Sequence, residues 1–574
     1  MTLNILLKLF AVFYILVSPI LVSSIDNLVI KGSKFFNGRT GNQFFFKGIS
    51  YQPRSFDLGN NPDPLALETQ CLRDIEYFKE LRINTIRVYE TDYNLNHDVC
   101  MEALEDAGIY VLLDIPSKSY SINRVSPSWD TYLYENFKKK IDAFNKYPNV
   151  AGYLIGNEVI TGNDTTPSAA FVKASVRDMK LYMKEKRYES YIGYADIDKD
   201  SVRINDSRYF DCGNDTNSKI DFYGINTFRW CDNNLTYTTS GYLNISESYS
   251  NYDIPVLVSA LGCVPEDGRE FNDLKTILGP NMTDVFSGGI AYEYSNEAGF
   301  GIVDIENGLV TKKPDFEYLK EALDLNPKND LKLTTFRESK NASTCPSVSS
   351  DWRVNSRSLP PTPQKNFCDC VYWSLKCLVG TKDIPRDELD RELERIVNYI
   401  CDSMNCGFIT SNTVDGYYGP ISSCSPNIRA KYIINKYFIF NDEDPSYCSY
   451  PTIGSIIIDK TKVSNVNQCK NTTLPNQEDP GDQVIIIENS NPSLSKKQLG
   501  RNPIAKNKPE NQVIKIESES SDVFDLISSP LINLRHNSLY RSRNLVKRNG
   551  SHINGIFLHL IILTVTVAIL FNLY

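Results

Sequence analysis

Eight short apolar segments recur between residues 44 and 294, and this alternation with helical stretches constrains the fold more than any other feature of the chain. The segments read "FFFKGISY", "TIRVY", "YVLLDIP", "VAGYLIGN", "SYIGYAD", "IDFYGIN", "IPVLVSALG" and "GGIAYEY". Helical stretches between them include residues 67–81, 97–107, 129–147 and 168–186. Strands that alternate with helices form parallel sheets, so eight units predict an α/β fold, a (β/α)8 TIM-like barrel over residues 25–330. The alternative, an open doubly wound sheet, lacks its glycine-rich loop after the first strand.

The cysteines predict a second, smaller domain. Residues 331–344 are polar and read as a linker. Nine of the fourteen cysteines lie between Cys345 and Cys469, which predicts a small disulfide-rich module over residues 345–470. Residues 471–549 are rich in Asn, Ser, Pro, Lys and Glu and poor in aromatic side chains, so we expect a disordered stalk that cannot bury a core.

Both ends of the chain carry targeting signals. Residues 1–24 combine Lys8, an apolar run and small residues, as in a cleaved signal peptide; a first membrane helix is the alternative. The apolar run from Ile556 to the last residue has no charged residue after it, which favours a GPI-attachment propeptide over residues 550–574 rather than a retained membrane helix. We place the attachment site at Asn549, although the spacer before Ile556 is short.

Glycosylation sequons support export to the outer plasma membrane and the cell wall. The chain has nine N-x-S/T sites: Asn163, Asn205, Asn214, Asn234, Asn244, Asn281, Asn341, Asn471 and Asn549. Fourteen cysteines also suit an oxidising compartment. The signals at both ends therefore predict a secreted, GPI-anchored glycoprotein.

The composition of the chain excludes several classes of partner and of catalytic site. The net charge of -9 argues against nucleic acid as a partner. Of the four histidines, only His97 lies outside the predicted stalk and propeptide, so we expect no Ser-His-Asp triad, no metal site and no cofactor. Any acid-base chemistry must come from carboxylates.

The clearest candidate carboxylate is Glu158, in "GNEV" at the end of the fourth predicted strand. Barrel enzymes place reactive groups at the carboxyl ends of their strands, so Glu158 should face the pocket beside Asn157. A carboxylic acid can protonate a glycosidic oxygen while an amide binds a sugar hydroxyl. By itself, the dipeptide equally suits a solvated loop.

Several longer motifs resemble the fungal β-1,3-glucanosyltransferases, glycoside hydrolase family 72, over residues 27 to about 470. They are "KGISYQP", "YNLNHDVCMEALEDAGIYVLLDIP", "SINRVSPSW", "YPNVAGYLIGNEV", "DFYGIN" and "NMTDVFSGGIAYEY". The resemblance implies a cell-wall protein that cleaves β-1,3-glucan with retention and passes the chain to another glucan. It implies Glu158 as acid/base and Tyr89, Asn157, Asp198, Arg203 and Tyr292 as substrate-binding residues.

The resemblance also shows what is missing. Retaining enzymes need two carboxyl groups about 5 to 5.5 Å apart, and the family places its nucleophile in S-E-Y-G-C after the seventh strand. Here the motif reads "SALGC", with Ala260 at the nucleophile position. The family's N-x-Y-x-W becomes "NTFRW", so Phe228 lacks the hydroxyl that could bond the nucleophile. The two replacements fit each other: without the glutamate at position 260, a tyrosine at position 228 would bury a hydroxyl with no hydrogen-bond partner, which costs free energy.

Three hypotheses remain open at the sequence level. Another carboxylate could replace the nucleophile, from among Glu90, Glu266 and Glu293. Weak activity could persist through Glu158 alone, although losing one member of a catalytic set costs several orders of magnitude. Otherwise the chain is a pseudoenzyme that binds glucan without cutting it. Strand alternation should turn Glu293 away from the pocket if Tyr292 and Tyr294 face it.

The module's landmarks "FCDCVYWSLKC" and "YYGPISSC" resemble the cysteine-rich carbohydrate-binding module of some family members. The family pattern implies the pairs Cys71–Cys100, Cys212–Cys345, Cys231–Cys263 and Cys401–Cys406. Trp373, Tyr417 and Tyr418 could contact glucan, but we expect them to pack in the module's core.

Overall fold

The computed structural model describes most of the chain between Ile25 and Cys469. The described residues are 25–53, 63–295, 299–327, 330–338, 343–379, 386–450, 452–453, 456–459, 462 and 469. The predicted signal peptide, stalk, Asn549 and GPI propeptide lie outside them. Within these ranges no helix combines the length and the apolar character that crossing a membrane requires.

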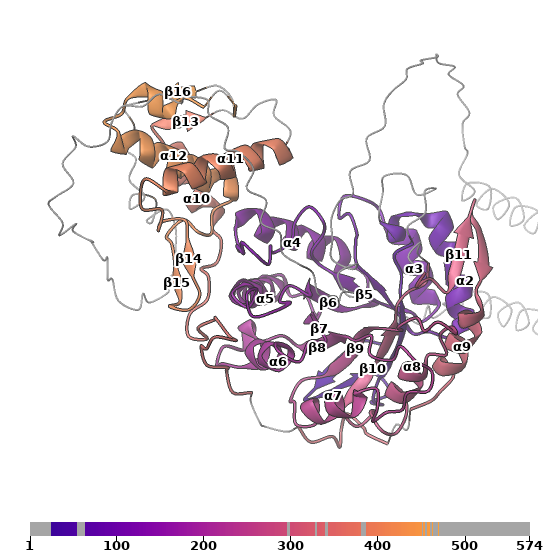
Figure 1. Ribbon diagram of the computed structural model, residues 1–574. Coiled ribbons are helices and arrows are strands. Elements are labelled where there is room, and N and C mark those ends of the chain that lie inside the picture. The colour runs from indigo at the N-terminus through magenta and orange to yellow at the C-terminus, as the bar shows by residue number, and fades with distance from the viewer. Residues whose placement is uncertain are drawn as a thin grey trace, which may run out of the picture. The chain divides into compact units, whose positions relative to one another are not determined.

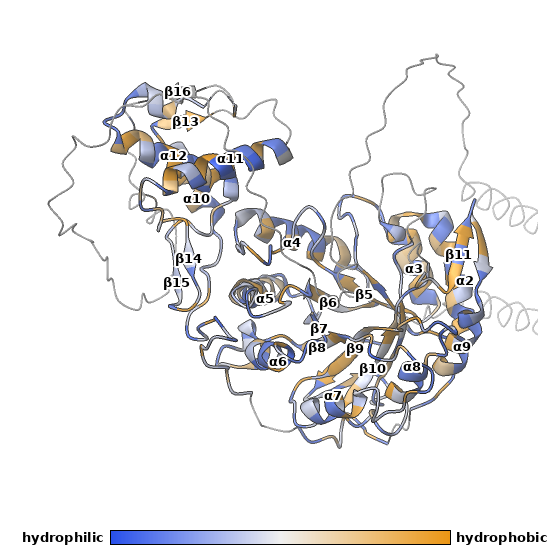
Figure 2. Ribbon diagram, viewed as in Figure 1, coloured by the Kyte–Doolittle hydropathy of each residue, from blue (hydrophilic) through white to orange (hydrophobic). Residues whose placement is uncertain are grey.

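The predicted barrel is confirmed. Within the described chain, eight parallel strands close in sequence order, with β10 hydrogen-bonded to β3 (Figure 1). The strands are β3 Phe46–Ser50, β4 Thr85–Val88, β5 Tyr110–Asp114, β6 Val150–Asn157, β7 Ile192–Ile197, β8 Phe222–Asn226, β9 Val256–Leu261 and β10 Phe286–Ala291. Figure 2 shows the hydrophobic character of strands such as β9, which are buried along their whole length. Continuous apolar burial is typical of strands covered on both faces.

Helices surround the barrel, the first four of them at the helical stretches that the sequence predicted. They are α2 Glu68–Leu81, α3 Asp98–Asp106, α4 Thr131–Phe144, α5 Ser168–Lys186, α6 Arg203–Asp211, α7 Tyr242–Tyr249, α8 Asn272–Ile277 and α9 Pro314–Leu323. Local signals set their starts: Asp130 caps α4 by accepting from the amides of Tyr132 and Leu133, and Pro314 occupies the first turn of α9.

A hairpin that we did not predict contributes to the barrel's inner core. Strands β1 Leu28–Lys31 and β2 Lys34–Asn37 pair antiparallel around a turn at Gly32. Phe35 packs edge-on against Phe46 and Phe222, at ring-centroid distances of 4.9 and 5.8 Å. The hairpin therefore extends the inner core at the first residues of β3 and β8 and leaves the carboxyl ends for the site. A second hairpin, β11 Val303–Glu306 with β12 Leu309–Lys312, follows the barrel.

The cysteine-rich module has its own buried core. Its elements are α10 Lys365–Trp373, β13 Cys377–Val379, α11 Arg386–Cys401, β14 Ser411–Asn412, β15 Tyr417–Tyr418, α12 Pro426–Phe440 and β16 Ile456–Ile458. All fourteen cysteines of the chain are paired. The structure forms the four pairs implied by the family and adds Cys368–Cys424, Cys370–Cys469 and Cys377–Cys448.

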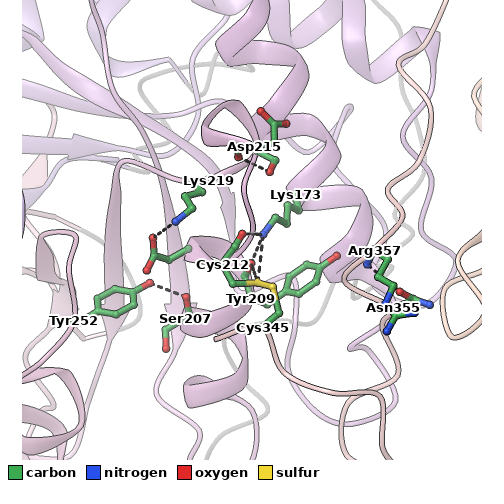
Figure 3. Close-up of a disulfide and its surroundings, with 12 residues drawn as sticks. Lys173, Ser207, Tyr209, Cys212, Asp215, Lys219, Tyr252, Cys345, Asn355 and Arg357 are labelled. Atoms are coloured by element: carbon green, nitrogen blue, oxygen red, sulfur yellow. Dashed lines mark hydrogen bonds and ion pairs between the residues drawn. A yellow bond between two sulfur atoms is a disulfide. The ribbon is translucent and has the colours of Figure 1, made fainter. Parts of the chain in front are cut away.

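The disulfide Cys212–Cys345 fastens the segment after the linker to the end of α6 (Figure 3). Lys173 of α5 donates to the Cys212 carbonyl at 2.8 Å and to the Tyr209 carbonyl, and burial lowers the pKa of this lysine to about 7. The Tyr209 ring packs against Trp352 at 5.2 Å. A covalent link and a buried aromatic pair thus hold this segment on the barrel.

One expectation for the module was wrong. Trp373 is 64% exposed and Tyr417 is 50% exposed, so neither packs in the core. Tyr418 packs against the barrel instead of the module's core, because its ring lies 6.0 Å from that of Phe171 on α5 and its hydroxyl donates to the Ser358 carbonyl. Trp373 lies at the last residue of α10, where its ring contacts Tyr372 and leaves one face in solvent.

Candidate active site

Two strand ends at the carboxyl side of the barrel are bulged. Between Leu154 and Asn157, strand β6 has one more residue than the matching part of β7. Strand β9 likewise gains one residue between Val258 and Ala260 against β8. A bulge re-aims the side chains that follow it and is common beside active sites. Glu158 and Ala260 both follow such a bulge, which marks position 260 as a site position.

Glu158 is held in an unusual backbone conformation. Its φ is +49°, in the left-handed region that few residues other than glycine adopt. Its amide donates to the Ala195 carbonyl at 2.9 Å, and its carbonyl accepts from Arg124 Nη2 at 2.9 Å. The hydroxyl of Tyr194 then accepts from the amides that follow, Val159 at 2.9 Å and Ile160 at 3.3 Å. These contacts fix the turn that presents the carboxylate.

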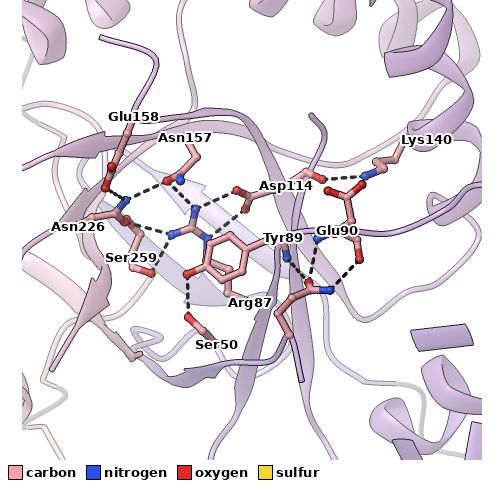
Figure 4. A network of polar contacts seen from close by, with 11 residues as sticks. Ser50, Arg87, Tyr89, Glu90, Asp114, Lys140, Asn157, Glu158, Asn226 and Ser259 are labelled. Carbon is pink, nitrogen blue, oxygen red and sulfur yellow. Dashed lines mark hydrogen bonds and ion pairs between the residues drawn. The ribbon is translucent and has the colours of Figure 1, made fainter. Parts of the chain in front are cut away.

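Arg87 organises the floor of the site (Figure 4). Its guanidinium is fully buried and makes two bonds of 3.0 Å to the carboxylate of Asp114. It also donates to Asn157 Oδ1 at 3.0 Å, to Asn226 Oδ1 at 3.1 Å and to the Ser259 carbonyl at 3.0 Å. Burial is the largest influence and lowers the pKa of Arg87, but Asp114, Tyr89 and Glu158 together outweigh it and hold this pKa above its ordinary value.

Two amides connect this floor to Glu158. Asn226 Nδ2 donates to Glu158 Oε1 at 2.7 Å and to Asn157 Oδ1 at 2.9 Å. The Oδ1 atom of Asn226 accepts from Ser259 Oγ at 2.8 Å and from Arg87. Because Asn226 is itself held by Arg87 and Ser259, the network fixes the Glu158 carboxylate that it bonds. Its predicted neighbour Asn157 is thus part of the same network.

The side of the site at the end of β9 carries no carboxylate of its own. Ala260 pairs with Asn226 across the sheet, its carbonyl accepts from the Thr227 amide at 2.8 Å, and it is 3% exposed. Leu261 follows it and is fully buried. The chain therefore presents a methyl group where the family resemblance implies a nucleophile.

Aromatic rings form the adjoining wall. Phe228, Tyr292 and Phe300 contact one another, with centroid distances of 6.0 Å for Phe228–Tyr292, 5.5 Å for Tyr292–Phe300 and 5.9 Å for Phe228–Phe300. Tyr89 continues the row, 6.2 Å from Tyr292, with the Arg87 guanidinium 4.4 Å over its ring. Phe228 is thus accommodated without a hydroxyl because it packs against two other rings.

The remaining predicted pair lies at the neighbouring strand end. Asp198 accepts from Arg203, Arg229 and the hydroxyl of Thr227, the last at 2.7 Å. Asp198 also donates its amide to the Asn226 carbonyl at 3.1 Å, which joins the pair to the central network. Both Asp198 and Arg203 are largely buried, so a sugar would meet Asp198 already engaged by two guanidinium groups.

The candidate replacement carboxylates differ in position. Glu90 lies beyond Asp114 and Tyr89, on the side away from Glu158 (Figure 4). Its Oε2 accepts from the Lys118 amide at 3.2 Å; burial raises the pKa of Glu90, and the charge of Lys140 opposes that rise. Glu266 is exposed on the loop after β9. Neither is placed across from Glu158 by these contacts.

The alternation argument for Glu293 does not apply. Strand β10 ends at Ala291, so residues 292–294 do not follow strand alternation. Tyr292 joins the aromatic wall, Tyr294 donates its hydroxyl to Asp74, and Glu293 is 1% exposed. Desolvation raises the pKa of Tyr89 to about 12, and the charge of Glu293 adds to this rise. The condition for the alternation is therefore not met, because the Tyr294 hydroxyl bonds Asp74 while Tyr292 joins the aromatic wall.

Asp196 and Asp206 form a buried acid pair behind Glu158. Both carboxyls are fully buried, and Tyr223 donates its hydroxyl to Asp196. Burial raises the pKa of Asp196 to about 8, and burial together with the charge of Asp196 raises that of Asp206. At least one proton is therefore retained in the pair at neutral pH.

We expect Asp196→Asn to flatten the pH dependence of stability. The carboxyl's pKa is about 8 when folded and about 4 when unfolded. Its contribution is complete below the unfolded pKa and is lost as pH rises toward 8, by at most about 1.4 kcal/mol per pH unit. Urea midpoints at several pH values should fall less steeply for the variant than for the natural chain. The exposed control Asp106→Asn should leave the slope unchanged, and an equal slope for Asp196→Asn would contradict the assignment.

Some of the site residues that the sequence analysis missed could have been identified from the sequence, and others could not. A charged residue inside the apolar segment "TIRVY" could have identified Arg87, because an arginine in a barrel strand must find a buried partner. Phe300 and Arg124 lie on loops; Arg124 falls within the family motif "SINRVSPSW", whereas no motif or strand-end position marks Phe300. Among the residues that the structure describes, no three His, Cys, Asp or Glu side chains gather as a metal site would require.

Comparisons with known proteins agree with this architecture. A family model described as Glucanosyltransferase matches residues 18–325, and an X8 domain model matches residues 376–455. The chain is 38% identical over 418 residues to a 1,3-beta-glucanosyltransferase of Arthroderma benhamiae, covering 71% of this chain and 75% of that protein. It is 37% identical over 438 residues to 1,3-beta-glucanosyltransferase GAS2 of Saccharomyces cerevisiae, covering 73% and 77%.

A solved structure extends the likeness to three dimensions. Saccharomyces cerevisiae Gas2p in complex with laminaritriose and laminaritetraose is 36% identical, with a TM-score of 0.67. The match covers 73% of this chain and 94% of that one.

Proposed function

This chain belongs to the glucanosyltransferase family, and on that premise we propose that it binds β-1,3-glucan in the fungal cell wall without cutting it by the family's double displacement. One observation carries the proposal: residue 260 at the bulged end of β9 is an alanine, and it pairs with Asn226, the residue whose side chain holds Glu158. Retention needs a second carboxyl group about 5 to 5.5 Å from the first. The neighbouring wall of Phe228 and Leu261 offers no oxygen in its place.

In this proposal the chain keeps the sugar-binding residues of the family although it lacks the nucleophile. Tyr89 and Tyr292 supply aromatic surface, and Asn157 with Glu158 supplies polar groups at the strand ends. Asp198 and Arg203 complete the polar edge. A few fixed polar groups beside aromatic rings are typical of carbohydrate and other ligand sites. Glu158 keeps the acid/base position, and its role without a nucleophile is to hold a sugar hydroxyl. The crystal complex of yeast Gas2p with laminari-oligosaccharides supports glucan as the ligand.

The proposal also covers where the protein resides and what its cysteine-rich module binds. Export, GPI attachment at Asn549 and residence at the outer plasma membrane and cell wall fit the sequence signals. We assign the module over residues 345–470 to glucan binding as well. The exposed rings of Trp373 and Tyr417 are the surfaces we assign to that contact.

A product assay tests the central claim. The secreted chain is incubated with reduced laminari-oligosaccharides, and products are separated by chromatography while binding is measured by calorimetry. We expect binding and no shorter or longer oligosaccharides. A ladder of products would contradict the proposal and favour an active transferase. Glu90→Gln and Glu293→Gln variants would then identify which carboxylate replaces the nucleophile.

Tyr292→Ala is expected to weaken laminari-oligosaccharide binding about fivefold, because the loss of one aromatic contact costs about 1 kcal/mol. The matched control is Tyr318→Ala, an exposed tyrosine of α9 outside the site. Calorimetry with laminaripentaose should separate the two variants. Equal affinities would show that the aromatic wall does not contact the glucan.

A further inference from the structure

We propose that Arg269 is a positioning residue for glucan, which holds two residues of the aromatic wall by their backbone carbonyls and touches no sugar itself. The inference rests on the proposed glucan binding and adds a residue that sets its strength. Tyr292 follows the end of β10, and Phe300 lies on an irregular segment farther along the chain. Two rings from separate segments present one surface to a ligand only when another group fixes their spacing.

One guanidinium group binds both of these segments. Arg269 Nη1 donates to the Tyr292 carbonyl at 2.7 Å, and Arg269 Nη2 donates to the Phe300 carbonyl at 2.6 Å. Nη1 also reaches the carbonyl of Gly262, which follows the end of β9, at 3.3 Å. The guanidinium group is planar and carries its N–H donors in a fixed fork, so one side chain sets the spacing of three segments.

The wall depends on the two residues that Arg269 holds. The rings of Tyr292 and Phe300 lie 5.5 Å apart, and the ring of Phe228 packs against both of them. Tyr89 contacts the wall through Tyr292. A change in the spacing of Tyr292 and Phe300 therefore alters the whole row of rings.

Arg269 is itself fixed by a helix of the barrel's outer layer. Its Nε and Nη2 atoms both donate to Asp315 Oδ2 of α9, at 3.0 and 2.6 Å. Its guanidinium carbon lies 4.8 Å from the centre of the Phe271 ring, and the residue is 2% exposed. A side chain so enclosed has no surface for a sugar, so its effect on binding passes through the wall.

The backbone at Gly262 makes room for these contacts. Its φ is +107°, a conformation that residues with a side chain rarely adopt. A Cβ atom there would lie 3.2 Å from the Phe271 ring, 3.4 Å from the Tyr292 carbonyl oxygen and 3.6 Å from Arg269 Nη1. A longer side chain at this position would crowd the groups that hold the guanidinium in place.

The substitution Arg269→Lys separates the charge of this residue from its geometry. A single ammonium group can keep the ion pair with Asp315, but it lacks the fork that reaches the Tyr292 and Phe300 carbonyls together. The wall would then have to be ordered when glucan binds, and that ordering reduces affinity.

The test measures the affinity of the secreted chain for laminaripentaose by calorimetry, with melting temperatures recorded so that unfolded variants are recognised. We expect Arg269→Lys to bind about five- to tenfold more weakly than the natural chain. The matched control is Arg177→Lys, because Arg177 also bonds a carboxylate, that of Asp178, and a backbone carbonyl, that of Pro360, but lies outside the site. This control should leave the affinity unchanged.

A second background distinguishes positioning from a general loss of structure. The variant Tyr292→Ala, Phe300→Ala lacks the rings that Arg269 positions, so adding Arg269→Lys to it should cost no further affinity. If Arg269→Lys does not fold, Asp315→Asn loosens the guanidinium without removing it and should show a smaller loss with the same dependence on the two rings.

Each outcome bears on a different claim. Unchanged affinity in the folded Arg269→Lys variant, or in Asp315→Asn where that variant replaces it, overturns this inference and leaves the proposed function standing. An equal further loss in the background without the two rings also overturns it, because the effect would not pass through the wall. Absence of laminaripentaose binding in the natural chain overturns the proposed function and this inference together.

Discussion

The Ala260→Glu, Phe228→Tyr double variant is expected to transfer glucan at a rate at least about 10³-fold above the natural chain. Removing one member of a catalytic set typically costs about 10⁴-fold or more, and its return should recover a large share. Residue 260 pairs with Asn226, whose side chain bonds Glu158, so we expect a glutamate there to reach the site. Chromatography of products from reduced laminari-oligosaccharides measures the gain as both shorter and longer chains.

Both substitutions are needed for the full effect. In Ala260→Glu alone, the new carboxylate would lie against Phe228 and Leu261, and such a wall raises the pKa of a carboxyl and weakens it as a nucleophile. The tyrosine hydroxyl in the double variant can donate to the carboxylate and oppose that rise. We therefore expect the single variant to gain less than the pair.

Two control variants separate chemistry from shape. Ala260→Gln, Phe228→Tyr has nearly the same volume without the charge, so it should show no gain. Adding Glu158→Gln to the active pair should abolish most of it, since the leaving oxygen loses its acid. An unchanged product pattern in the active pair would mean that residue 260 does not reach the anomeric carbon, and the premise of the site would be wrong.

The sequence predicted the barrel because its signals are long-range and redundant. Eight apolar segments bounded by helical stretches leave few alternatives, and the predicted helix at 168–186 coincides with α5 Ser168–Lys186. The hairpin β1–β2 was missed because its two strands have only four residues each. Such short apolar runs do not differ enough from a loop for periodicity to identify them.

The site was predictable in part. Strand-end position and family motifs selected Glu158 and Ala260, and the structure puts both after bulges. The bulges themselves leave no trace in composition, because one inserted residue changes the direction of the side chains and not their character. Glu293 illustrates the limit of such patterns, because alternation was applied to residues 292–294, which lie beyond the end of β10.

Arg87→Met is expected to destabilise the barrel by about 3 to 5 kcal/mol. Removing one partner of a buried ion pair leaves the other charge unpaired in a poorly solvated place. Asp114 would lose both of its 3.0 Å bonds, and the Asn157, Asn226 and Ser259 oxygens would each lose a donor. Urea or thermal unfolding of the secreted chain, together with the amount secreted, measures the loss.

A control at an exposed ion pair shows whether the loss of stability comes from the burial of Arg87. Arg82→Met removes an arginine whose partner Asp324 is also exposed, so that variant should cost at most about 1 kcal/mol. Combining Arg87→Met with Asp114→Leu removes both charges and should recover part of the stability, because the uncompensated carboxylate disappears. The amides Asn157 and Asn226 would still lack their common donor, so the double variant should bind laminaripentaose more weakly even when it folds. Full affinity in that variant would mean that Glu158 is positioned without the Arg87 network.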